Sequence, residues 1–258
     1  MCIRDRLTAV IITKNEASNI ARCLTSLQSV VDEILVIDSG SEDDTVDIAR
    51  QMGARVITTE WKGYAQTKNF GNNRASNDWI LSVDADEVIS QELGNEILNL
   101  KLTEGQAYSF NRLNNFFGQW IKHSGWFPDW KIRIFERQNA YWVGEYVHEK
   151  IKFSNPVRIK KMEGLLYHYS YQSHEDHWNR IELYSGLSAA ELFAKRAKPS
   201  WIKQKGGPVF RFFKTFILQK GFLDGKAGWT ISKRAAHTVR LKYEKLNKLY
   251  EKLKNVKY

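Results

Sequence analysis

Short apolar segments alternate with helical segments through the first hundred residues, and this alternation limits the folds open to the chain. Residues 7–13 (LTAVIIT) form a nearly continuous β-branched run, which is typical of a strand buried on both faces. Residues 33–37, 54–58 and 79–83 predict three further strands. Strands that alternate with helices favour a mostly parallel central sheet flanked by helices, with right-handed crossovers. The predicted fold class is therefore α/β.

Helices are expected between these strands. Asn15 is the expected N-cap of the first helix, and residues 45–52 and 64–74 predict the second and third. Ligands bind such sheets at the carboxyl ends of the parallel strands. Any functional site is therefore expected where these strands end.

The second half of the chain has a different pattern. Residues 105–149 alternate aromatic and polar side chains, which predicts antiparallel or mixed strands. Residues 173–198 predict a long helix, ended by Pro199 and a break at Gly206-Gly207-Pro208. We predict a catalytic domain over 1–200 and a basic, amphipathic helical extension over 201–258.

The net charge of +10 is unevenly distributed. Residues 201–258 contain 15 Lys or Arg against 3 Asp or Glu, whereas the remaining residues contain 24 against 26. An aromatic and basic segment is followed by a Lys-rich helix, a combination typical of an interfacial helix on an anionic bilayer. Packing of the apolar stripe on the catalytic domain is the alternative. The stripe consists of Val239, Tyr243, Leu246, Leu249, Tyr250 and Leu253.

Composition excludes several classes of protein. A hydrophobic content of 43% is too high for a disordered chain, and two cysteines exclude a disulfide scaffold and Cys-rich zinc modules. No stretch reaches the roughly 18 to 20 apolar residues of a membrane-spanning helix, and residues 1–6 have no signal-peptide pattern. The expected location is the cytoplasm, peripheral on the inner face of the cytoplasmic membrane.

Acidic residues follow several of the predicted strands. The first strand is followed by residues 13–16 (TKNE), the second by residues 38–41 (DSGS), and the fourth by residues 84–87 (DADE). Three acidic strand ends on one sheet edge repel one another unless they share a cation or hydrogen-bond a polyol. Two carboxylates separated by one residue suit Mg²⁺ or Mn²⁺, with a diphosphate and water as the remaining ligands. A metal held there would neutralise a leaving diphosphate.

Competing nucleotide and hydrolase motifs are absent from the sequence. It contains no G-x-x-x-x-G-K-[ST], no G-x-G-x-x-G after the first strand and no G-x-S-x-G. A phosphate would thus be held by a metal and side chains instead of a glycine-rich loop.

Three stretches carry a family resemblance: VIITKNEASNIARCLTSL, EILVIDSGSEDDTVDIA and KGYAQTKNFGNNRASNDWILSVDADE. They resemble the nucleotide-binding half of a family 2 glycosyltransferase with the GT-A fold. RIFERQNAYWVGEYVHEKI, LLYHYSY and GFLDGKAGW are similar to the lipopolysaccharide core β-1,4-glucosyltransferases. The resemblance implies a nucleotide-sugar half at about 7–100, an acceptor half at about 101–200, and a Rossmann-like arrangement of the first half.

The resemblance also implies a donor site for a UDP-sugar. Thr13 and Glu16 would line the uridine pocket, and Asp38 would hydrogen-bond the base or ribose. Lys68 would lie near the base and phosphates, with a solvated helix lysine as the alternative. The predicted nucleotide-sugar residues are Thr13, Glu16, Asp38, Ser41, Lys68, Asp84 and Ala85.

A divalent metal, Mg²⁺ or Mn²⁺, is implied in the same way. Asp86 would be its principal ligand, and Asp84 would contact the metal or the ribose. Members of this fold often supply a late histidine, for which His168 is favoured over His148. A core histidine with satisfied hydrogen bonds is the alternative for each.

An inverting transfer needs a carboxylate base that takes the proton of the attacking acceptor hydroxyl. Many family 2 enzymes supply it from a Glu-Asp pair, but the corresponding region of this chain reads Val147-His148-Glu149. Glu149 is the predicted base, and Asp129 and Glu145 are its rivals.

Tryptophans indicate where an acceptor sugar could bind. Trp120, Trp126 and Trp130 lie close together in the sequence, and indoles stack on the apolar faces of sugars. Core packing is the alternative reading. His174 and His177 are spaced for a metal on one helix face, although surface histidines more often have no such role.

The sequence therefore predicts an inverting, metal-dependent transfer of a sugar, with glucose favoured by the subgroup resemblance, to a lipid-linked or lipopolysaccharide-core acceptor. A nucleic-acid-binding protein that uses the basic tail is one alternative, but unshielded strand-end carboxylates would repel phosphates. A nucleotidyltransferase is another, although it would normally have a Gly-rich basic loop after the first strand. We expect no nucleic-acid partner.

Overall fold

The structure is a computed structural model that describes residues 6–144, 149–171 and 173–255. Its described residues form two compact units, which are presented separately. The first unit contains residues up to Leu113 together with Pro128–Tyr169. The second contains Asn114–Phe127 and the residues from Ser170 onwards. The predicted functional boundary at residue 200 stays a prediction.

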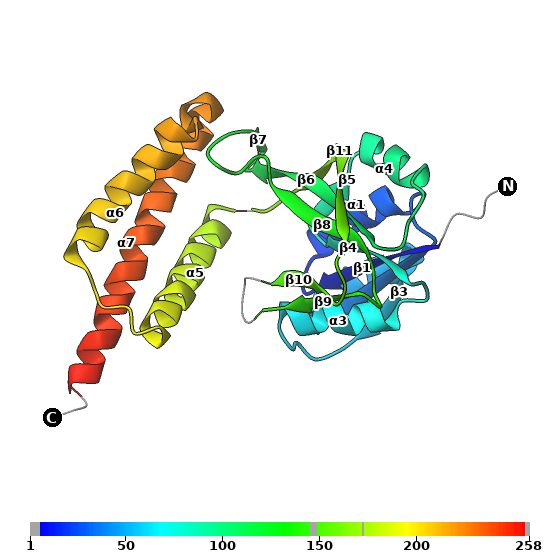
Figure 1. Cartoon of the computed structure of the whole chain (residues 1–258), viewed down its shortest axis with the longest axis horizontal. Coiled ribbons are helices and arrows are strands. Elements are labelled where there is room, and N and C mark those ends of the chain that lie inside the picture. The colour runs from blue at the N-terminus through cyan, green and yellow to red at the C-terminus, as the bar shows by residue number, and fades with distance from the viewer. Residues whose placement is uncertain (1–5, 145–148, 172, 256–258) are drawn as a thin grey trace. The chain divides into compact units, whose positions relative to one another are not determined.

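Four parallel strands form one half of the sheet in the first unit. They lie in the order β3 (Arg55–Thr58), β2 (Glu33–Asp38), β1 (Leu7–Thr13) and β4 (Trp79–Asp84). Thr13 is in register with Asp38, and Ile12 with Asp84. The predicted α/β fold and its parallel strands are confirmed (Figure 1). The registers bring the carboxyl ends of β1, β2 and β4 together at one edge of the sheet.

The other half of the sheet is antiparallel. Beyond β4 the sheet continues through β8, β6 and β11 to β5, and β7 pairs with the end of β6. A separate two-stranded ribbon is formed by β9 and β10. These strands span Glu87–Ile89 (β5), Gln106–Phe116 (β6), Gln119–Ile121 (β7), Trp130–Glu136 (β8), Ala140–Val143 (β9), Lys150–Phe153 (β10) and Arg158–His168 (β11). The predicted change to antiparallel or mixed strands is therefore confirmed.

Helices cover both faces of the sheet, which explains the β-branched run of β1. Leu7, Ala9 and Ile11 face one apolar cluster, whereas Val10 and Ile12 face another. The first cluster includes side chains of α1 (Ala17–Leu27), α2 (Thr45–Gln51) and α4 (Gln91–Leu98), and the second includes α3 (Tyr64–Arg74). A strand with helices on both faces has no solvent-facing side, so its residues do not alternate in polarity.

Asn15 is not the N-cap of α1, contrary to the prediction. Glu16 occupies the N-cap position, and Asn15 has a left-handed backbone with φ of 56°. The Asn15 side chain accepts a hydrogen bond from the Glu42 amide at 2.8 Å instead. The residue therefore joins the loops after β1 and β2, a contact between distant segments that local sequence cannot reveal.

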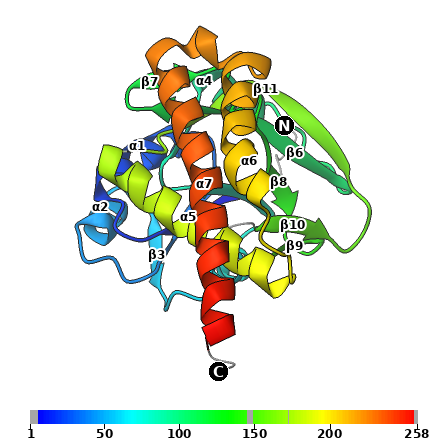
Figure 2. The same cartoon turned by 90° about the vertical axis from the view of Figure 1, so that its left-hand side faces the viewer.

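The second unit is largely helical (Figure 2). Its helices are α5 (His174–Ala194), α6 (Trp201–Phe213), a π-helical turn (Lys214–Leu218), a 3₁₀ turn (Gly221–Asp224) and α7 (Gly225–Asn255). The predicted break at Gly206-Gly207-Pro208 is wrong, because α6 continues through it. A Cβ at Gly207 would lie 3.2 Å from Val239 Cγ1, so this glycine permits close packing of α6 on α7. That packing offsets the hydrogen bond which Pro208 cannot donate.

The apolar stripe of α7 packs inside the second unit. Leu246 is fully buried, Val239 faces Gly207 of α6, and the Tyr250 ring lies 4.9 Å from the ring of Phe193 in α5. Val239 and Tyr250 of the stripe therefore contact α6 and α5, whereas Leu253 is 45% exposed. None of the helices among the described residues is long and apolar enough to cross a bilayer.

Candidate functional site

The loop after β2 is ordered by the carboxylate of Asp38. This buried side chain accepts hydrogen bonds from the amides of Gly40 and Ser41 at 2.9 and 3.0 Å, and from the Ser41 hydroxyl. The Ser41 hydroxyl in turn accepts a bond from the Asn15 amide at 2.9 Å. Asp38 and Ser41, both predicted site residues, thus fix the two loops that follow β1 and β2.

Thr13 and Glu16 border the same loops. Within the described part of the chain, the buried hydroxyls of Thr13 and Ser39 have no hydrogen-bond partner, although the Ser39 amide donates to the Thr13 carbonyl at 2.9 Å. The Glu16 carboxylate accepts a hydrogen bond from the Asn19 amide group at 2.8 Å. A buried hydroxyl without a hydrogen-bond partner lowers the stability of the fold, and a polar group of a ligand would remove this penalty by bonding to it.

Lys68 connects two predicted functional carboxylates. Its amine lies 3.0 Å from Asp84 Oδ1 and 3.4 Å from Glu149 Oε1, and 4.6 Å from the ring of Trp142. The side chain is only 4% exposed, so Lys68 is not a solvated helix lysine. α3 thus supplies a buried cation to the edge where β4 ends.

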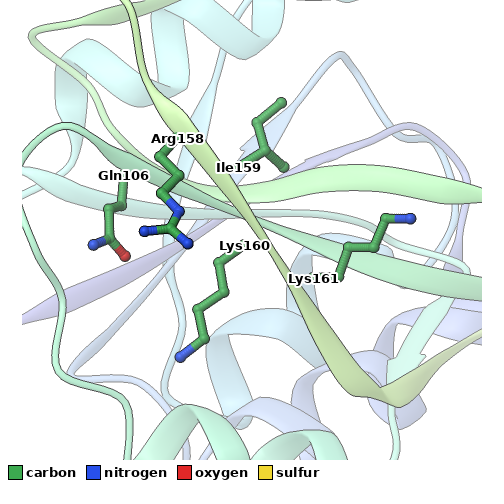
Figure 3. A pocket seen from close by; sticks show the side chains of 5 residues that line it. All are labelled: Gln106, Arg158, Ile159, Lys160 and Lys161. Atoms are coloured by element: carbon green, nitrogen blue, oxygen red, sulfur yellow. The ribbon is translucent and has the colours of Figure 1, made fainter.

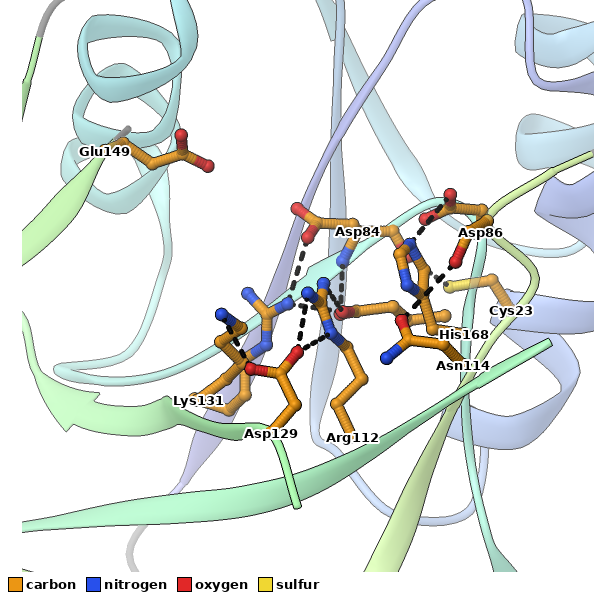
Figure 4. Close-up of polar contacts among 12 residues, drawn as sticks. Cys23, Asp84, Asp86, Arg112, Asn114, Asp129, Lys131, Glu149 and His168 are labelled. Atoms are coloured by element: carbon orange, nitrogen blue, oxygen red, sulfur yellow. Dashed lines mark hydrogen bonds and ion pairs between the residues drawn. The ribbon is translucent and has the colours of Figure 1, made fainter. Parts of the chain in front are cut away.

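A series of ion pairs continues from Asp84 (Figure 4). Arg133 on β8 contacts Asp84 Oδ2 at 2.9 Å and also the fully buried Glu87. Arg112 on β6 lies 3.2 Å from Glu87 and 2.8 Å from Asp129. The series ends at Lys131, 3.0 Å from Asp129. Positive and negative groups alternate along it, so each carboxylate has a cationic partner.

These partners decide the protonation of the carboxylates. Burial alone would raise the pKa of Asp84, but Lys68 and Arg133 outweigh it and hold that pKa well below the usual range. Burial and the opposing Arg112 act in the same way on Asp129, whose pKa is also lowered. Burial would lower the pKa of Arg133, but Glu87 and Asp84 raise it. Asp84, Asp129 and Arg133 are therefore stabilised in their charged forms.

Asp86 forms a separate pair with His168. The His168 Nε2 atom at the end of β11 lies 3.1 Å from Asp86 Oδ2, and the Tyr169 amide donates to the Asp86 carbonyl at 2.9 Å. A carboxylate oxygen and an imidazole nitrogen this close suit a divalent cation completed by a diphosphate and water. No cluster of three protein ligands occurs among the described residues. His148 lies outside them.

The two described candidates for the base have different surroundings. Asp129 is held between Arg112 and Lys131, and its lowered pKa makes it a weak base. Glu149 contacts the amine of Lys68 at 3.4 Å, which it shares with Asp84. Glu145, the third candidate, lies outside the described residues. Asp129 therefore has two close cationic partners, and Glu149 stays the predicted base.

The structure does not gather all predicted residues at this edge. The Ala85 side chain is buried in the core, which leaves only its backbone available. Trp120 and Trp126 belong to the second unit, where Trp126 packs edge-to-face on Phe116, whereas Trp130 belongs to the first. The three tryptophans therefore do not form one cluster within either unit.

Sequence reasoning missed Glu87, Arg112 and Arg133. Glu87 directly follows the DAD motif, and Arg133 lies two residues after Lys131 on the same side of β8. An acidic run at one strand end and charged residues alternating with isoleucines on another strand are signals that could have paired them. The pairing itself depends on β4 and β8 being neighbours, which local pattern does not determine.

A hollow in the first unit lies at the start of β11, away from the residues described above (Figure 3). It measures about 540 Å³ and is lined by Gln106 and residues 158–161, with the long basic side chains extending separately. Arg158 is at the opposite end of β11 from His168. The hollow is therefore distinct from the acidic strand ends.

Comparisons with known proteins bear on this site. The glycosyl transferase family 2 profile matches residues 8–163. A Rickettsia felis protein named as an uncharacterized glycosyltransferase is 34% identical over 98% of this chain and 93% of its own. The lipopolysaccharide core biosynthesis glycosyltransferase LpsC of Rhizobium meliloti is 23% identical over 86% of this chain and 87% of its own.

Among solved structures, the similarity is more limited. Glucosyl-3-phosphoglycerate synthase from Mycobacterium tuberculosis, in complex with Mn²⁺, UDP and glucosyl-3-phosphoglycerate, aligns with a TM-score of 0.35 and 23% identity. The alignment covers 43% of this chain and 44% of that one.

Proposed function

The chain belongs to glycosyl transferase family 2, is a glycosyltransferase and has the GT-A fold, and from this premise we propose that it is an inverting enzyme that transfers a sugar from a UDP-sugar. The contacts of Lys68 are the observation that carries the proposal. Its amine lies within 3.4 Å of Asp84, a predicted donor-binding residue, and of Glu149, the predicted base. The proposed donor site and the proposed base thus lie beside each other in the first unit, at the edge where β4 ends.

The donor nucleoside would bind at the loops after β1 and β2. The buried hydroxyls of Thr13 and Ser39 would gain partners there, and the hydrogen bonds of Asp38 hold the Ser41 loop in place. Ordering before binding reduces the entropy lost when the ligand arrives. The predicted roles of Glu16 and Lys68 in this site are part of the proposal.

Asp86 and His168 would hold the divalent metal, Mg²⁺ or Mn²⁺. Their paired oxygen and nitrogen atoms fit such an ion, whereas Asp84 is already neutralised by Lys68 and Arg133. When bound, the metal supplies positive charge to the diphosphate. Asp84 is therefore assigned to positioning of Lys68 and the donor, and Asp86 to the metal.

Glu149 would act as the base. The acceptor oxygen forms a bond to the anomeric carbon while the bond from that carbon to the diphosphate oxygen breaks. The acceptor proton passes to the Glu149 carboxylate, and UDP leaves with the electron pair of the broken bond. Attack on the face opposite the leaving group inverts the anomeric configuration.

The acceptor is proposed to be a lipid-linked or lipopolysaccharide-core glycan. The similarity to LpsC over most of both chains supports a lipopolysaccharide-core acceptor, and glucose is the donor sugar that we would test first. Trp120, Trp126 and Trp130 are the candidate acceptor residues. Trp130 has the ammonium of Lys161 4.7 Å from its ring, which leaves its other face as the candidate stacking surface.

An exposed apolar surface supports attachment to an anionic membrane. Ile202, Val209, Phe213 and Ile217 recur at spacings of seven, four and four residues, and Ile202 is 74% exposed. Residues 201–230 carry six Lys or Arg, and Asp224, their one acidic residue, is buried. Exposed apolar side chains in a segment rich in Lys and Arg suit an anionic lipid surface. The enzyme is accordingly proposed to work at the inner face of the cytoplasmic membrane.

A panel of UDP-sugars with and without Mn²⁺ tests the function. We expect UDP plus Mn²⁺ to raise the melting temperature, since a ligand at 100 times its Kd stabilises by about 2.7 kcal/mol. Asp86→Ala should lose the Mn²⁺-dependent part, whereas Glu149→Gln should keep it. Stabilisation by oligonucleotides but not by UDP would instead identify a nucleic-acid-binding protein.

Vesicle co-sedimentation tests the membrane surface. Ile202 and Val209 are 74% and 71% exposed, so the double variant Ile202→Ser/Val209→Ser should bind anionic vesicles several-fold more weakly. Leu183→Ser is the matched control, because Leu183 on α5 is 56% exposed but lies outside the surface. Equal binding by both variants, or equal binding to neutral vesicles, would contradict the assignment.

A further inference from the structure

A second pocket lies wholly within the helical second unit. It has a volume of about 380 Å³ and is bordered by α5, α6, α7 and the aromatic side chains of Trp126 and Tyr171. Four cations line it: Arg180, Arg211, Arg234 and Lys242. No Asp or Glu is present among its described lining residues. The pocket therefore combines aromatic walls with an excess of positive charge.

Arg234 is the most buried of these cations. It is 8% exposed, and its guanidinium donates to Nδ1 of His174 at 2.8 Å and to Nδ1 of His177. A histidine nitrogen that accepts a hydrogen bond is unprotonated, so neither contact supplies negative charge. No carboxylate pairs with Arg234 in the described ranges. The two histidines thus orient the guanidinium without neutralising it.

Lys242 and Arg211 add further unneutralised charge. Burial lowers the pKa of Lys242, and the nearby cations Arg211 and Lys203 lower it further. Neither Lys242 nor Arg211 has an ion pair with a carboxylate in the described structure. Cations that repel one another at a pocket destabilise the folded state. A bound anion would replace this repulsion by attraction.

The basic hollow at the start of β11 differs from this pocket in the exposure of its side chains. Residues 158–161 beside β11 are all exposed, and their side chains extend separately into solvent (Figure 3). Solvated lysines and arginines need no partner. Unlike that hollow, the pocket of the second unit has a buried guanidinium, that of Arg234, and aromatic walls beside the exposed Arg211 and the partly exposed Lys242.

We propose that this pocket binds a phosphate group carried by a sugar of the acceptor. The guanidinium of Arg234 presents its N–H groups from a fixed position, and Arg211 and Lys242 supply the remaining charge. Guanidinium groups match phosphate oxygens in geometry and charge. Trp126 and Tyr171 line the pocket beside these cations and would contact the attached sugar. The phosphate site stands on the pocket alone, whereas its assignment to the acceptor rests on the proposed function.

Direct binding of a small phosphorylated sugar tests this site. Glucose 6-phosphate is titrated into the full chain by calorimetry, with EDTA to remove metals and excess UDP to fill any nucleotide site. We expect binding that weakens with salt, and no binding of glucose itself. Lys242→Gln and Arg211→Gln should each weaken it about tenfold, which corresponds to about 1.4 kcal/mol.

Arg240→Gln is the matched control. Arg240 is also a cation of α7, but it is exposed, pairs with Glu244 at 2.6 Å and does not line the pocket. This variant should bind glucose 6-phosphate within twofold of the unaltered chain. Equal weakening by Arg240→Gln, or equal binding of glucose and glucose 6-phosphate, would overturn the site.

A final comparison identifies the source of the phosphate. Vesicles containing phosphatidylglycerol are offered to the unaltered chain, Lys242→Gln and Arg211→Gln. If only vesicle binding depends on these two cations, the phosphate belongs to a lipid headgroup and the acceptor assignment is overturned. If glucose 6-phosphate binding depends on them, the assignment is supported. Neither measurement uses donor or metal, so loss of transfer in the UDP-sugar panel leaves this result independent.

Discussion

The two units of this chain treat buried charge in opposite ways. In the first unit, Asp84, Glu87 and Asp129 each contact two cations, and the partners continue one another in an alternating series. In the second unit, the buried guanidinium of Arg234 is held by two histidine nitrogens that carry no negative charge. The first arrangement is electrostatically complete within the protein, whereas the second has positive charge to offer a ligand.

This difference suggests a division of roles. A self-neutralised series can hold its side chains rigidly whether or not a ligand is present, which suits the positioning of a donor and a base. A cationic pocket gains its favourable interactions only when an anion enters. The following predictions test each side of the comparison.

Glu149→Gln should have the largest effect. The substitution removes the proposed base but keeps the shape of the side chain, so the rate of transfer should fall by about 10²–10⁴-fold with little change in donor affinity. Steady-state kinetics with a saturating donor measures this loss. Asp129→Asn provides the comparison, because a larger loss there would transfer the role of base to Asp129.

Glu87→Gln should break the series at its most buried member. Arg133 and Arg112 would each lose a carboxylate partner inside the protein, so we expect the free energy of unfolding to fall by about 3–5 kcal/mol. Urea denaturation followed by tryptophan fluorescence measures it. Glu136→Gln on β8 is the control: burial raises the pKa of Glu136, so losing its charge should cost nothing. Similar losses in both variants would contradict the role of the series.

A fall in pH should have the next largest effect, which is a loss of stability of the first unit. The pKa values of Asp84 and Asp129 are lowered in the folded state, so their stabilising contribution is present above the unfolded pKa of about 4 and is lost as the pH falls through the folded values. Thermal unfolding between pH 7 and pH 3 should show a falling melting temperature. Asp129→Asn should make that fall shallower, and an identical slope would exclude Asp129 as a contributor.

Lys242→Gln should have the smallest effect on stability, and in the opposite direction. Removing one of several mutually repelling cations should leave the free energy of unfolding unchanged or raise it by up to about 0.5 kcal/mol. The same urea measurement compares it with Glu87→Gln. A loss above 1 kcal/mol would mean that Lys242 has a carboxylate partner in solution, and the contrast between the units would be lost.

The parallel half of the fold could be predicted from the sequence because its signal is local. β-branched runs predicted β1, β2 and β4 within a residue or so, and Tyr64–Arg74 is helical as expected. The path of α6 through Pro208 could not be predicted, because it depends on the fit of Gly207 against Val239 of a distant helix.

The candidate site shows the same difference between local sequence signals and long-range contacts. Asp84, Asp86 and Asp38 are recognisable because they lie at or just after strand ends. His168 lies 3.1 Å from Asp86, and the preference for it over His148 stays a prediction. The ion pairs of Glu87, Arg112 and Arg133 could not be read from the sequence, since they join β4, β5, β6 and β8. Side chains that act through a neighbour on another strand carry no motif of their own.

The second unit includes a short segment that lies, in the sequence, between two parts of the first unit. Residues 114–127 separate Leu113 from Pro128, both of the first unit, yet they provide Ser124, whose hydroxyl donates to the buried Asp224 at 2.7 Å. No single uninterrupted stretch of the gene therefore encodes the second unit. During synthesis, residues 114–127 are translated about a hundred residues before Asp224, so this contact can form only after Asp224 has been added.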